Sequence, residues 1–185
     1  MRSASAYGKK TRSVKSCVGK AFCRFGTQNT TRLGIRLEET FEYIDTPHKF
    51  KMGVSGCPRS CVESGVKDFG VIGVENGYQI YIGGNGGTEV TIGQYLTTVE
   101  TEAEVLKLCG ALMQYYRETG NYAERTAPWL NRLGFEHVRN ILLDKAKQDV
   151  LYARILEAKC AVEKEPWSEI VNSKKEQKIF EVEKV

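Results

Sequence analysis

Residues 53–61 read Gly-Val-Ser-Gly-Cys-Pro-Arg-Ser-Cys, so that Cys57 and Cys61 stand in a glycine-containing turn with three residues between them. A second pair, Cys17 and Cys23, lies in another such turn, with five residues between its cysteines. A cubane iron-sulfur cluster is held by four thiolates, and each pair can supply two of them from one loop. The 33 residues between the pairs are enough for a helix and a strand that bring the loops together. The sequence therefore indicates an iron-sulfur site.

Two alternatives to a cluster stay open from the cysteines alone. Zinc also takes four thiolates, but its structural sites usually have two to four residues between paired cysteines, so the longer gap between Cys17 and Cys23 counts against it. The other alternative is a set of buried or disulfide-bonded structural cysteines, although six in 185 residues are sparse for a disulfide scaffold. Cys109 and Cys160 lie on apolar stripes of predicted helices, so we expect both to be core residues and not ligands.

The first part of the chain is strongly basic. Nine Lys or Arg residues precede Glu38, the first acidic residue, although the whole chain has a net charge of only +4. They are Arg2, Lys9, Lys10, Arg12, Lys15, Lys20, Arg24, Arg32 and Arg36. Such a segment is either a solvated arm or an anion-binding surface, and nucleic acid is the usual anion for a basic stretch. Neither alternative explains why these residues bracket the first cysteine pair, and we expect no nucleic-acid partner.

Length and composition predict one soluble globular domain. The chain is 41% hydrophobic and 27% charged, and 185 residues can bury one sizeable core. It has neither the apolar run of a signal peptide nor the roughly 18 apolar residues of a membrane span, so we expect a cytoplasmic location and no membrane partner. The only two histidines, His48 and His137, lack the neighbours of a hydrolase site, and no catalytic residue is assigned.

Apolar periodicity and turn signals predict an α+β fold, in which helices pack on a small mixed sheet and a helical C-terminal region follows. The expected strands are residues 13–17, 50–54, 70–75 and 78–82, with Asn76-Gly77 as a hairpin turn. The expected helices are residues 27–43, a segment through Val62 and Val66, a segment starting at the capping box Thr101–Glu104, a short one from Pro128, and 135–143. A helix start at Cys57–Cys61 would point amide groups and a positive dipole end at the thiolates.

We divide the chain into two parts on this pattern. Residues 1–143 form the main domain, and residues 144–185 form a C-terminal helical extension and tail packed on the same domain. The tail from Asn172 to Val185, with alternating Lys and Glu, is expected to be a solvated extension or a late strand. Trp129 is expected to be a packing anchor.

Four segments carry a family resemblance, namely Cys17-Val-Gly-Lys-Ala-Phe-Cys23-Arg-Phe-Gly-Thr-Gln, Gly53-Val-Ser-Gly-Cys57-Pro-Arg-Ser-Cys61, Tyr81-Ile-Gly-Gly-Asn-Gly-Gly-Thr88 and Arg125-Thr-Ala-Pro-Trp-Leu-Asn-Arg-Leu133. Together they resemble the siroheme and 4Fe-4S half of the nitrite and sulfite reductases, over about residues 5–143. Within that family the likeness is strongest to the large subunit of the NAD(P)H-dependent assimilatory nitrite reductases. Two spaced cysteine motifs and two further segments make the resemblance specific.

The resemblance implies a role for each paired cysteine. In the family, the last cysteine of the second pair bridges the cluster and the siroheme iron, which places this role on Cys61. Cys17, Cys23 and Cys57 are then the other cluster ligands. Electrons would pass from the cluster to the siroheme iron, where nitrite is reduced to ammonium. The residues expected to contact siroheme are Arg24, Arg59, Gly84 and Asn85.

The chain also departs from the family pattern. Many sulfite-reducing and ferredoxin-linked relatives have Asn where this chain has Arg59. The family's substrate-binding basic residues lie mostly in an upstream half that this chain does not contain, and its flavin and NAD(P)H domains are missing too. We therefore expect the isolated chain to be inactive and its partners to be these missing parts, together with a small subunit. The alternative functions are a sulfite reductase fragment, a haem-free iron-sulfur electron carrier and a zinc-stabilised basic binding module.

Overall fold

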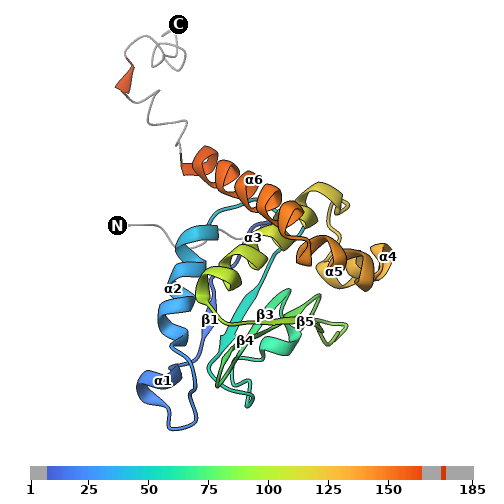
Figure 1. Ribbon diagram of the computed structural model, residues 1–185. Coiled ribbons are helices and arrows are strands. Elements are labelled where there is room, and N and C mark those ends of the chain that lie inside the picture. Colours follow the sequence, from blue (N-terminus) through green and yellow to red (C-terminus); the bar gives the residue numbers. More distant parts are fainter. Residues whose placement is uncertain (1–7, 164–171, 174–185) are drawn as a thin grey trace, which may run out of the picture.

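The computed structural model describes residues 8–163 and 172–173, so the tail predicted over residues 172–185 lies outside the described residues except for its first two positions. A five-stranded mixed sheet in the order β1-β2-β3-β4-β5 forms its centre, and helices pack on this sheet (Figure 1). The strands are β1 (Lys15–Ser16), β2 (Met52–Ser55), β3 (Phe69–Val74), β4 (Gly77–Ile82) and β5 (Gln94–Val99). The first three run parallel, and β4 is antiparallel to both of its neighbours. The predicted α+β class with a small mixed sheet is confirmed.

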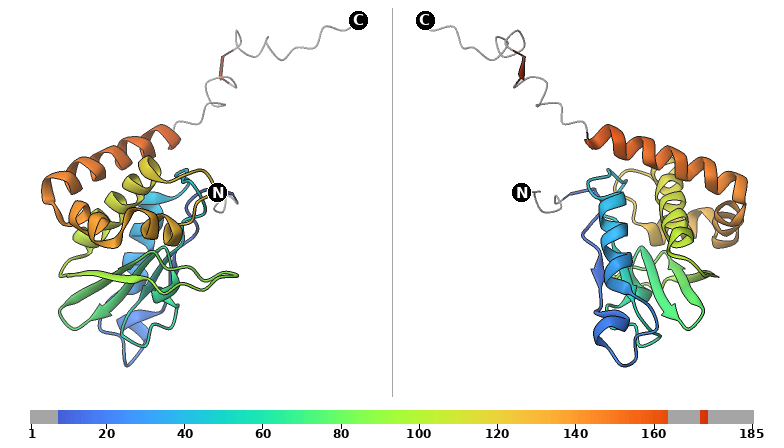
Figure 2. Two further views of the ribbon diagram at one scale, coloured as in Figure 1. Left: turned by 90° about the vertical axis from the view of Figure 1, so that its right-hand side faces the viewer. Right: turned by 60° about the vertical axis from the view of Figure 1, so that its left-hand side comes forward.

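The helices form layers over the sheet. In the described part of the chain they are α1 (Gly19–Phe22), α2 (Thr30–Phe41), α3 (Glu102–Thr119), α4 (Thr126–Leu133), α5 (Phe135–Leu143), α6 (Lys145–Glu163) and the short 3-10 helix η1 (Ser64–Val66). Helix α2 packs on β1 and β2, and α6 packs along α3 on the side that faces away from the sheet (Figure 2). None of these helices combines the length and the apolar content needed to cross a bilayer.

The core lies between the sheet and the helices. Cys109 of α3 is fully buried and contacts Met52 of β2, with 3.6 Å between their sulfur atoms. Trp129 of α4 is 1% exposed, packs edge-on against Tyr116 and donates a hydrogen bond from Nε1 to Oγ1 of Thr119 at 2.9 Å. The predicted core position of Cys109 and the packing role of Trp129 are confirmed.

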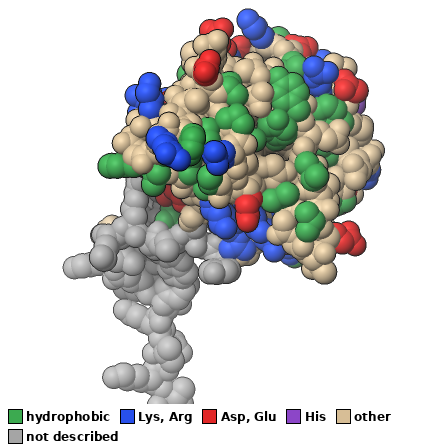
Figure 3. Space-filling model, turned by 90° about the horizontal axis from the view of Figure 1, so that it is seen from below, with side chains coloured by type: hydrophobic (Ala, Val, Ile, Leu, Met, Phe, Trp, Pro, Cys, Tyr) green, Lys and Arg blue, Asp and Glu red, His purple; other side chains and the backbone are tan. Residues whose placement is uncertain are grey.

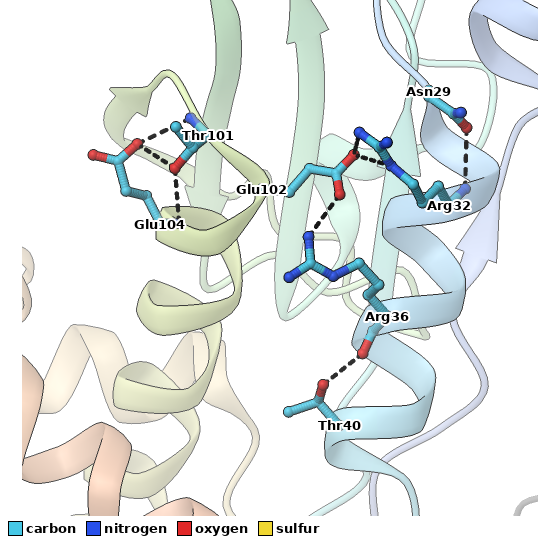
Figure 4. A network of polar contacts seen from close by, with 7 residues as sticks. All are labelled: Asn29, Arg32, Arg36, Thr40, Thr101, Glu102 and Glu104. Carbon is cyan, nitrogen blue, oxygen red and sulfur yellow. Dashed lines mark hydrogen bonds and ion pairs between the residues drawn. The ribbon is translucent and has the colours of Figure 1, made fainter.

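Helix α3 begins as its sequence predicts. The amide of Glu104 donates to Oγ1 of Thr101 at 3.2 Å, and the amide of Thr101 donates to the Glu104 carboxylate at 2.9 Å (Figure 4). This reciprocal capping box satisfies two amide groups that would otherwise lack partners at the helix start. It fixes where α3 begins, and so where Glu102 points.

The predicted helix after the second cysteine pair is wrong. Instead of an α-helix, tight turns lead to the single 3-10 turn of η1. Ser60 and Glu63 adopt left-handed backbone conformations, with φ of 50° and 58°. Two such residues close together interrupt a right-handed helix, since each reverses the local backbone twist. The expected helix dipole beside Cys57 and Cys61 is therefore absent.

The β3–β4 hairpin is confirmed, but its turn is displaced by one residue. Val74 pairs with Gly77, so the loop is Glu75-Asn76 and not Asn76-Gly77. The positive φ, 136°, belongs to Gly77, where the chain enters β4 against the backbone of Val99. A Cβ atom on Gly77 would lie 2.1 Å from the Val99 carbonyl oxygen, which explains the glycine.

The predicted core position of Cys160 is wrong, because its side chain is exposed. Helix α6 buries Leu151, Ile155 and Lys159, which recur at intervals of four residues. The buried face of the helix therefore includes Lys159 and not Cys160, the next residue. Lys159 can be buried because its Nζ donates to the Glu42 carbonyl oxygen at 3.1 Å and lies 3.5 Å from the Glu42 carboxylate.

Candidate metal centre

Two neighbouring parallel strands bring the first cysteine of each pair to one edge of the sheet. Strand β1 pairs with β2 through Ser16 and Val54, so Cys17 and Cys57 both follow at the carboxyl ends of these strands. The Cys17 amide donates to the Val54 carbonyl oxygen at 3.1 Å. The amide of Gly56 in turn donates to Sγ of Cys17 at 3.1 Å. The two cysteine loops therefore lie directly against each other, as the sequence predicts.

Gly56 has no room for a side chain at this junction. A Cβ atom there would lie 3.0 Å from Cα of Gly19 and 3.2 Å from Cγ2 of Thr30. We expect Gly56→Ala to lower the free energy of unfolding by about 1–3 kcal/mol, because the added methyl group must push the two loops apart. Urea unfolding measures this loss. Gly65→Ala is the matched control, since a Cβ atom on Gly65 meets nothing within 4 Å, and an equal loss in both variants would contradict the close approach.

Phe25 makes a second connection between the loops. It follows Cys23 by two residues, and the guanidinium carbon of Arg59 lies 4.0 Å from its ring centroid. Arg59 stands in the turn 57–61, so this contact joins that turn to the end of the first loop. The guanidinium carbon of Arg24 lies 4.5 Å from the same centroid. Two of the four predicted siroheme contacts thus share one aromatic ring.

The four thiols lie in neighbouring loops but do not yet form a closed ligand set. Cys57 is buried, Cys17 and Cys23 are half-buried, and Cys61 is exposed. All six cysteines of the chain are described and free, so the disulfide alternative is wrong. Within residues 8–163 and 172–173, no three His, Cys, Asp or Glu side chains gather as ready metal ligands. Metal sites are commonly completed only as the metal binds, and here four thiols on two adjacent loops are the donor set of a four-thiolate centre.

Gly84 and Asn85 lie towards the other end of the sheet. Ile82, which precedes their loop, pairs with Phe69 at the start of β3, whereas Cys17 follows the carboxyl end of β1. A Cβ atom on Gly84 would lie 2.5 Å from the carbonyl oxygen of Lys67. The glycine loop therefore packs on the continuation of the second cysteine loop and not on the first. Its contact with siroheme stays a prediction.

A buried carboxylate from α3 holds two of the basic residues of the first segment. Oε1 of Glu102 accepts hydrogen bonds from Arg32 at 2.9 and 2.7 Å, and its Oε2 accepts one from Arg36 at 2.8 Å (Figure 4). Arg32 and Arg36 lie one turn apart on α2, so a single carboxylate reaches both. These two exposed arginines are paired with a carboxylate of the protein itself, and the predicted free basic surface is correspondingly smaller.

This network predicts a loss of stability in acid. Burial alone would raise the pKa of Glu102, but the hydrogen bonds and charges of Arg32 and Arg36 outweigh it and hold the pKa below its usual range. A carboxyl group whose pKa is lowered by folding stabilises the folded state above its unfolded pKa, and this stabilisation is lost as pH falls through the folded pKa. We expect Glu102→Gln to cost about 1–2 kcal/mol at pH 7.

Thermal unfolding of the parent chain and Glu102→Gln between pH 7 and pH 3 checks this prediction. The stability difference between the two proteins should be present near neutrality and shrink below about pH 4. A difference that stayed constant over the whole range would show that the effect of the substitution is steric and not electrostatic.

A second buried carboxylate, which the sequence did not reveal, fastens α4 to the sheet. Asp68 is fully buried at the start of β3, and its two carboxylate oxygens each lie 2.9 Å from Nη2 of Arg125. It also accepts hydrogen bonds from the Lys51 amide at 2.8 Å and from the hydroxyl group of Thr126. Arg125 and Thr126 open the segment 125–133, which carries part of the family resemblance. The sequence marks the segment 125–133 through the family resemblance. Nothing in the sequence indicates that Asp68 is the partner of this segment.

Comparisons with known proteins agree with the predicted family. A family model described as the nitrite and sulphite reductase 4Fe-4S domain matches residues 7–150. The chain is 52% identical over 182 residues to the nitrite reductase (NAD(P)H) of Bacillus subtilis (strain 168), an alignment that covers 98% of this chain and 22% of that protein. It is 36% identical over 182 residues to the nitrite reductase (NADH) large subunit of Escherichia coli (strain K12), covering 95% of this chain and 21% of that one. The chain thus spans about a fifth of the length of these relatives.

The fold also has a counterpart among solved structures. The crystal structure of dissimilatory sulfite reductase I (DsrI) matches 75% of this chain and 53% of its own, with a TM-score of 0.68 and 17% identity. At this identity the likeness concerns the fold alone. It supports the sheet and helix arrangement around the two cysteine loops.

Proposed function

Since the chain belongs to the nitrite and sulphite reductase 4Fe-4S domain family, we propose that Cys17, Cys23, Cys57 and Cys61 bind a 4Fe-4S cluster. The observation that carries the proposal is the junction of both cysteine loops at the carboxyl ends of β1 and β2. A hydrogen bond to a ligating sulfur tunes the reduction potential of such a cluster, and the amide of Gly56 already points at Sγ of Cys17. The protein thus contributes the four cysteine ligands, the two loops that hold them together, and the Gly56 amide as a hydrogen-bond donor to Sγ of Cys17.

Siroheme is the second cofactor of the proposal, and Cys61 would be the thiolate that bridges it to the cluster. Cys61 is the exposed member of the four, which suits a thiolate that must reach a metal outside the cluster as well as one within it. Arg24, Arg59, Gly84 and Asn85 would line the macrocycle, with the arginines at its carboxylates. When bound, the cluster would relay electrons that come from the NAD(P)H-linked remainder of the enzyme, and the siroheme would supply the iron at which nitrite is reduced to ammonium.

The chain itself would be one portion of a larger nitrite reductase. The two nitrite reductases compared above are about five times as long, so the substrate-binding basic residues and the flavin and NAD(P)H domains would belong to the remaining length, with a small subunit as a further partner. Residues 1–143 would form the cofactor domain, and residues 144–185 its C-terminal extension. Sulfite is the second candidate substrate, because the family description names both enzymes. Nitrite ranks first because the relatives at 52% and 36% identity are named nitrite reductases.

Anaerobic reconstitution of the chain with ferrous iron and sulfide tests the cluster. We expect iron and inorganic sulfide in nearly equal amounts. Zinc without sulfide would overturn the proposal in favour of a zinc-stabilised module. If the reconstituted protein binds siroheme, it is not a haem-free electron carrier. Comparing the turnover rates of nitrite and sulfite in the complete enzyme decides the substrate.

The bridging role of Cys61 gives a prediction of its own. In protein loaded with both cofactors, Cys61→Ser should disturb the magnetic coupling between siroheme and cluster more than Cys17→Ser does, because only Cys61 joins the two irons directly. Electron paramagnetic resonance spectra of the two variants measure the coupling. Equal spectra would contradict the assignment of the bridge to Cys61.

A further inference from the structure

An exposed apolar patch lies around α1 and α2, directly beside the first cysteine loop. Val18, Phe22 and Ile35 form it, and their side chains are 54%, 85% and 52% exposed. Helices α1 and α2 contact each other, and the face that carries α1 shows hydrophobic side chains at the surface with Lys and Arg side chains beside them (Figure 3). Single exposed apolar residues are ordinary on a soluble protein, but a contiguous group of them marks an interaction surface.

Two neighbouring grooves make this patch continuous. The first groove has a volume of about 330 Å³ and is lined by Val18 and Ile35. The second groove has a volume of about 390 Å³ and is lined by Phe22 and Ile35. Thr31 and Ile35 of α2 line both grooves, so one apolar segment can lie across the pair. The patch is therefore hollowed and can receive side chains of a partner.

The rim of the second groove is basic. Arg32 and Arg36 line this groove, and both stay exposed although Glu102 binds them. Lys20 adds a further exposed cation on α1. In a face-to-face dimer each patch meets its own copy, so this positive rim would meet the same positive rim. The patch therefore fits a different partner, whose apolar segment is flanked by acidic side chains.

We propose that the patch formed by Val18, Phe22 and Ile35 is the docking surface for an apolar, acid-flanked segment from the remaining length of the enzyme. The inference rests on the proposed function in one respect, since that function makes this chain one portion of a longer protein. The alignments cover only 22% and 21% of the two nitrite reductases compared above, so most of such a protein is available to supply the segment.

The docking surface adjoins the candidate metal centre. Cys17 lines the first groove and is half-buried, so a segment seated there would exclude water from this thiolate. Phe22 directly precedes Cys23, so covering its ring would also restrict the first cysteine loop. Exposure to solvent is one of the factors that set the reduction potential of an iron-sulfur cluster. Docking would thus complete the surroundings of the cluster and not only join two parts of the enzyme.

Hydrogen exchange over residues 18–35, measured in the 185-residue chain alone and in the complete enzyme, tests the surface. We expect these amides to exchange roughly tenfold or more slowly in the complete enzyme, because a docked segment suppresses local opening. Phe22→Ser and Ile35→Ser should each remove most of this slowing, since each takes an apolar side chain out of the contact. Tyr122→Ser is the matched control, because Tyr122 is 83% exposed but lines neither groove, and the slowing should survive it.

A charge variant supports the same test without altering the apolar patch. Lys20→Glu should also weaken the slowing, because it reverses one charge on the basic rim that faces the acidic flanks. Thermal unfolding of the isolated variants should match that of the parent chain, since all three side chains are exposed before docking. Equal exchange in the isolated chain and the complete enzyme would overturn the proposal. Slowing that persists in the Phe22, Ile35 and Lys20 variants would overturn it as well.

Sedimentation of the isolated chain decides between the proposed occupant and a second copy. We expect a monomer at micromolar concentration, because the basic rims repel each other. A dimer that Phe22→Ser dissociates would assign the patch to a second copy and overturn the proposal.

Failure of this inference can be told apart from failure of the proposed function. Iron and sulfide are measured after reconstitution of the isolated chain, where no docked segment is present. A cluster that forms normally, together with unchanged exchange in the complete enzyme, would remove the docking surface and leave the function intact. Slowed exchange in an enzyme whose chain never assembles a cluster would uphold the docking surface and remove the function.

Discussion

Iron and sulfide should fall to near-background levels when Cys57 is replaced by serine, the largest change expected of any single substitution in this chain. Cys57 is 8% exposed and stands at the end of β2, where the second loop meets the first. A cubane cluster takes one thiolate on each iron, and a serine hydroxyl group at this buried position is a poor substitute because it holds its proton far more tightly. Iron and acid-labile sulfide assays after anaerobic reconstitution measure the loss.

Cys160→Ser provides the control for Cys57→Ser. Cys160 is exposed on α6, far along the chain from the loops, and its removal should leave both contents unchanged. Thermal unfolding of the two cluster-free variants shows whether each is folded before reconstitution. If folded Cys57→Ser protein still took up as much iron and sulfide as the parent chain, the four-cysteine ligand set would be wrong.

The sequence was informative wherever a local pattern decides the structure. The alternation and turn signals around Asn76 predict the β3–β4 hairpin, and the capping box at Thr101 predicts the start of α3. The two cysteine pairs predict that their loops meet, and the pairing of β1 with β2 does bring Cys17 and Cys57 to one edge. In each case the residues that carry the signal lie within a few positions of the feature that they specify.

The sequence was silent or misleading where distant residues decide. Strand β5 has no clear apolar alternation, because it is an edge strand that keeps only Leu96 fully buried, and its existence depends on pairing with β4. The inward face of α6 is set by Lys159, whose partner Glu42 lies 117 residues earlier. Without that partner a buried lysine is unfavourable, so the apolar pattern points to Cys160 instead.

The same limit applies to the electrostatics around the candidate site. Nine basic residues before Glu38 predict a free positive surface, yet two of them, Arg32 and Arg36, share the single carboxylate of Glu102 some 70 residues away. Arg24 and Arg59 have no such partner among the described residues. Only the three-dimensional arrangement separates charges used for folding from charges left for a ligand, since all of them look alike in the sequence.

Asp68→Ala is expected to lower the free energy of unfolding by about 3–5 kcal/mol, the largest stability effect in the chain. Asp68 is fully buried, and the side chain of Arg125 is only 14% exposed, so the substitution would leave a buried guanidinium group without its counter-charge. The Lys51 amide and the Thr126 hydroxyl group would lose their acceptor as well. A typical domain is stable by only about 5–15 kcal/mol, so the variant should unfold at markedly lower urea concentration.

Pairing each substitution with its partner shows where this energy comes from. Asp68→Ala together with Arg125→Met should cost clearly less than the sum of the single substitutions, because no uncompensated charge is left buried. Lys147→Ala is the surface control, since Lys147 and Asp144 are 61% and 39% exposed and their pair should contribute no more than about 0.5 kcal/mol. Additive costs of the Asp68 and Arg125 substitutions would mean that the two side chains stabilise the fold independently. Strong coupling would instead show that the ion pair between Asp68 and Arg125 holds the start of α4 on the sheet.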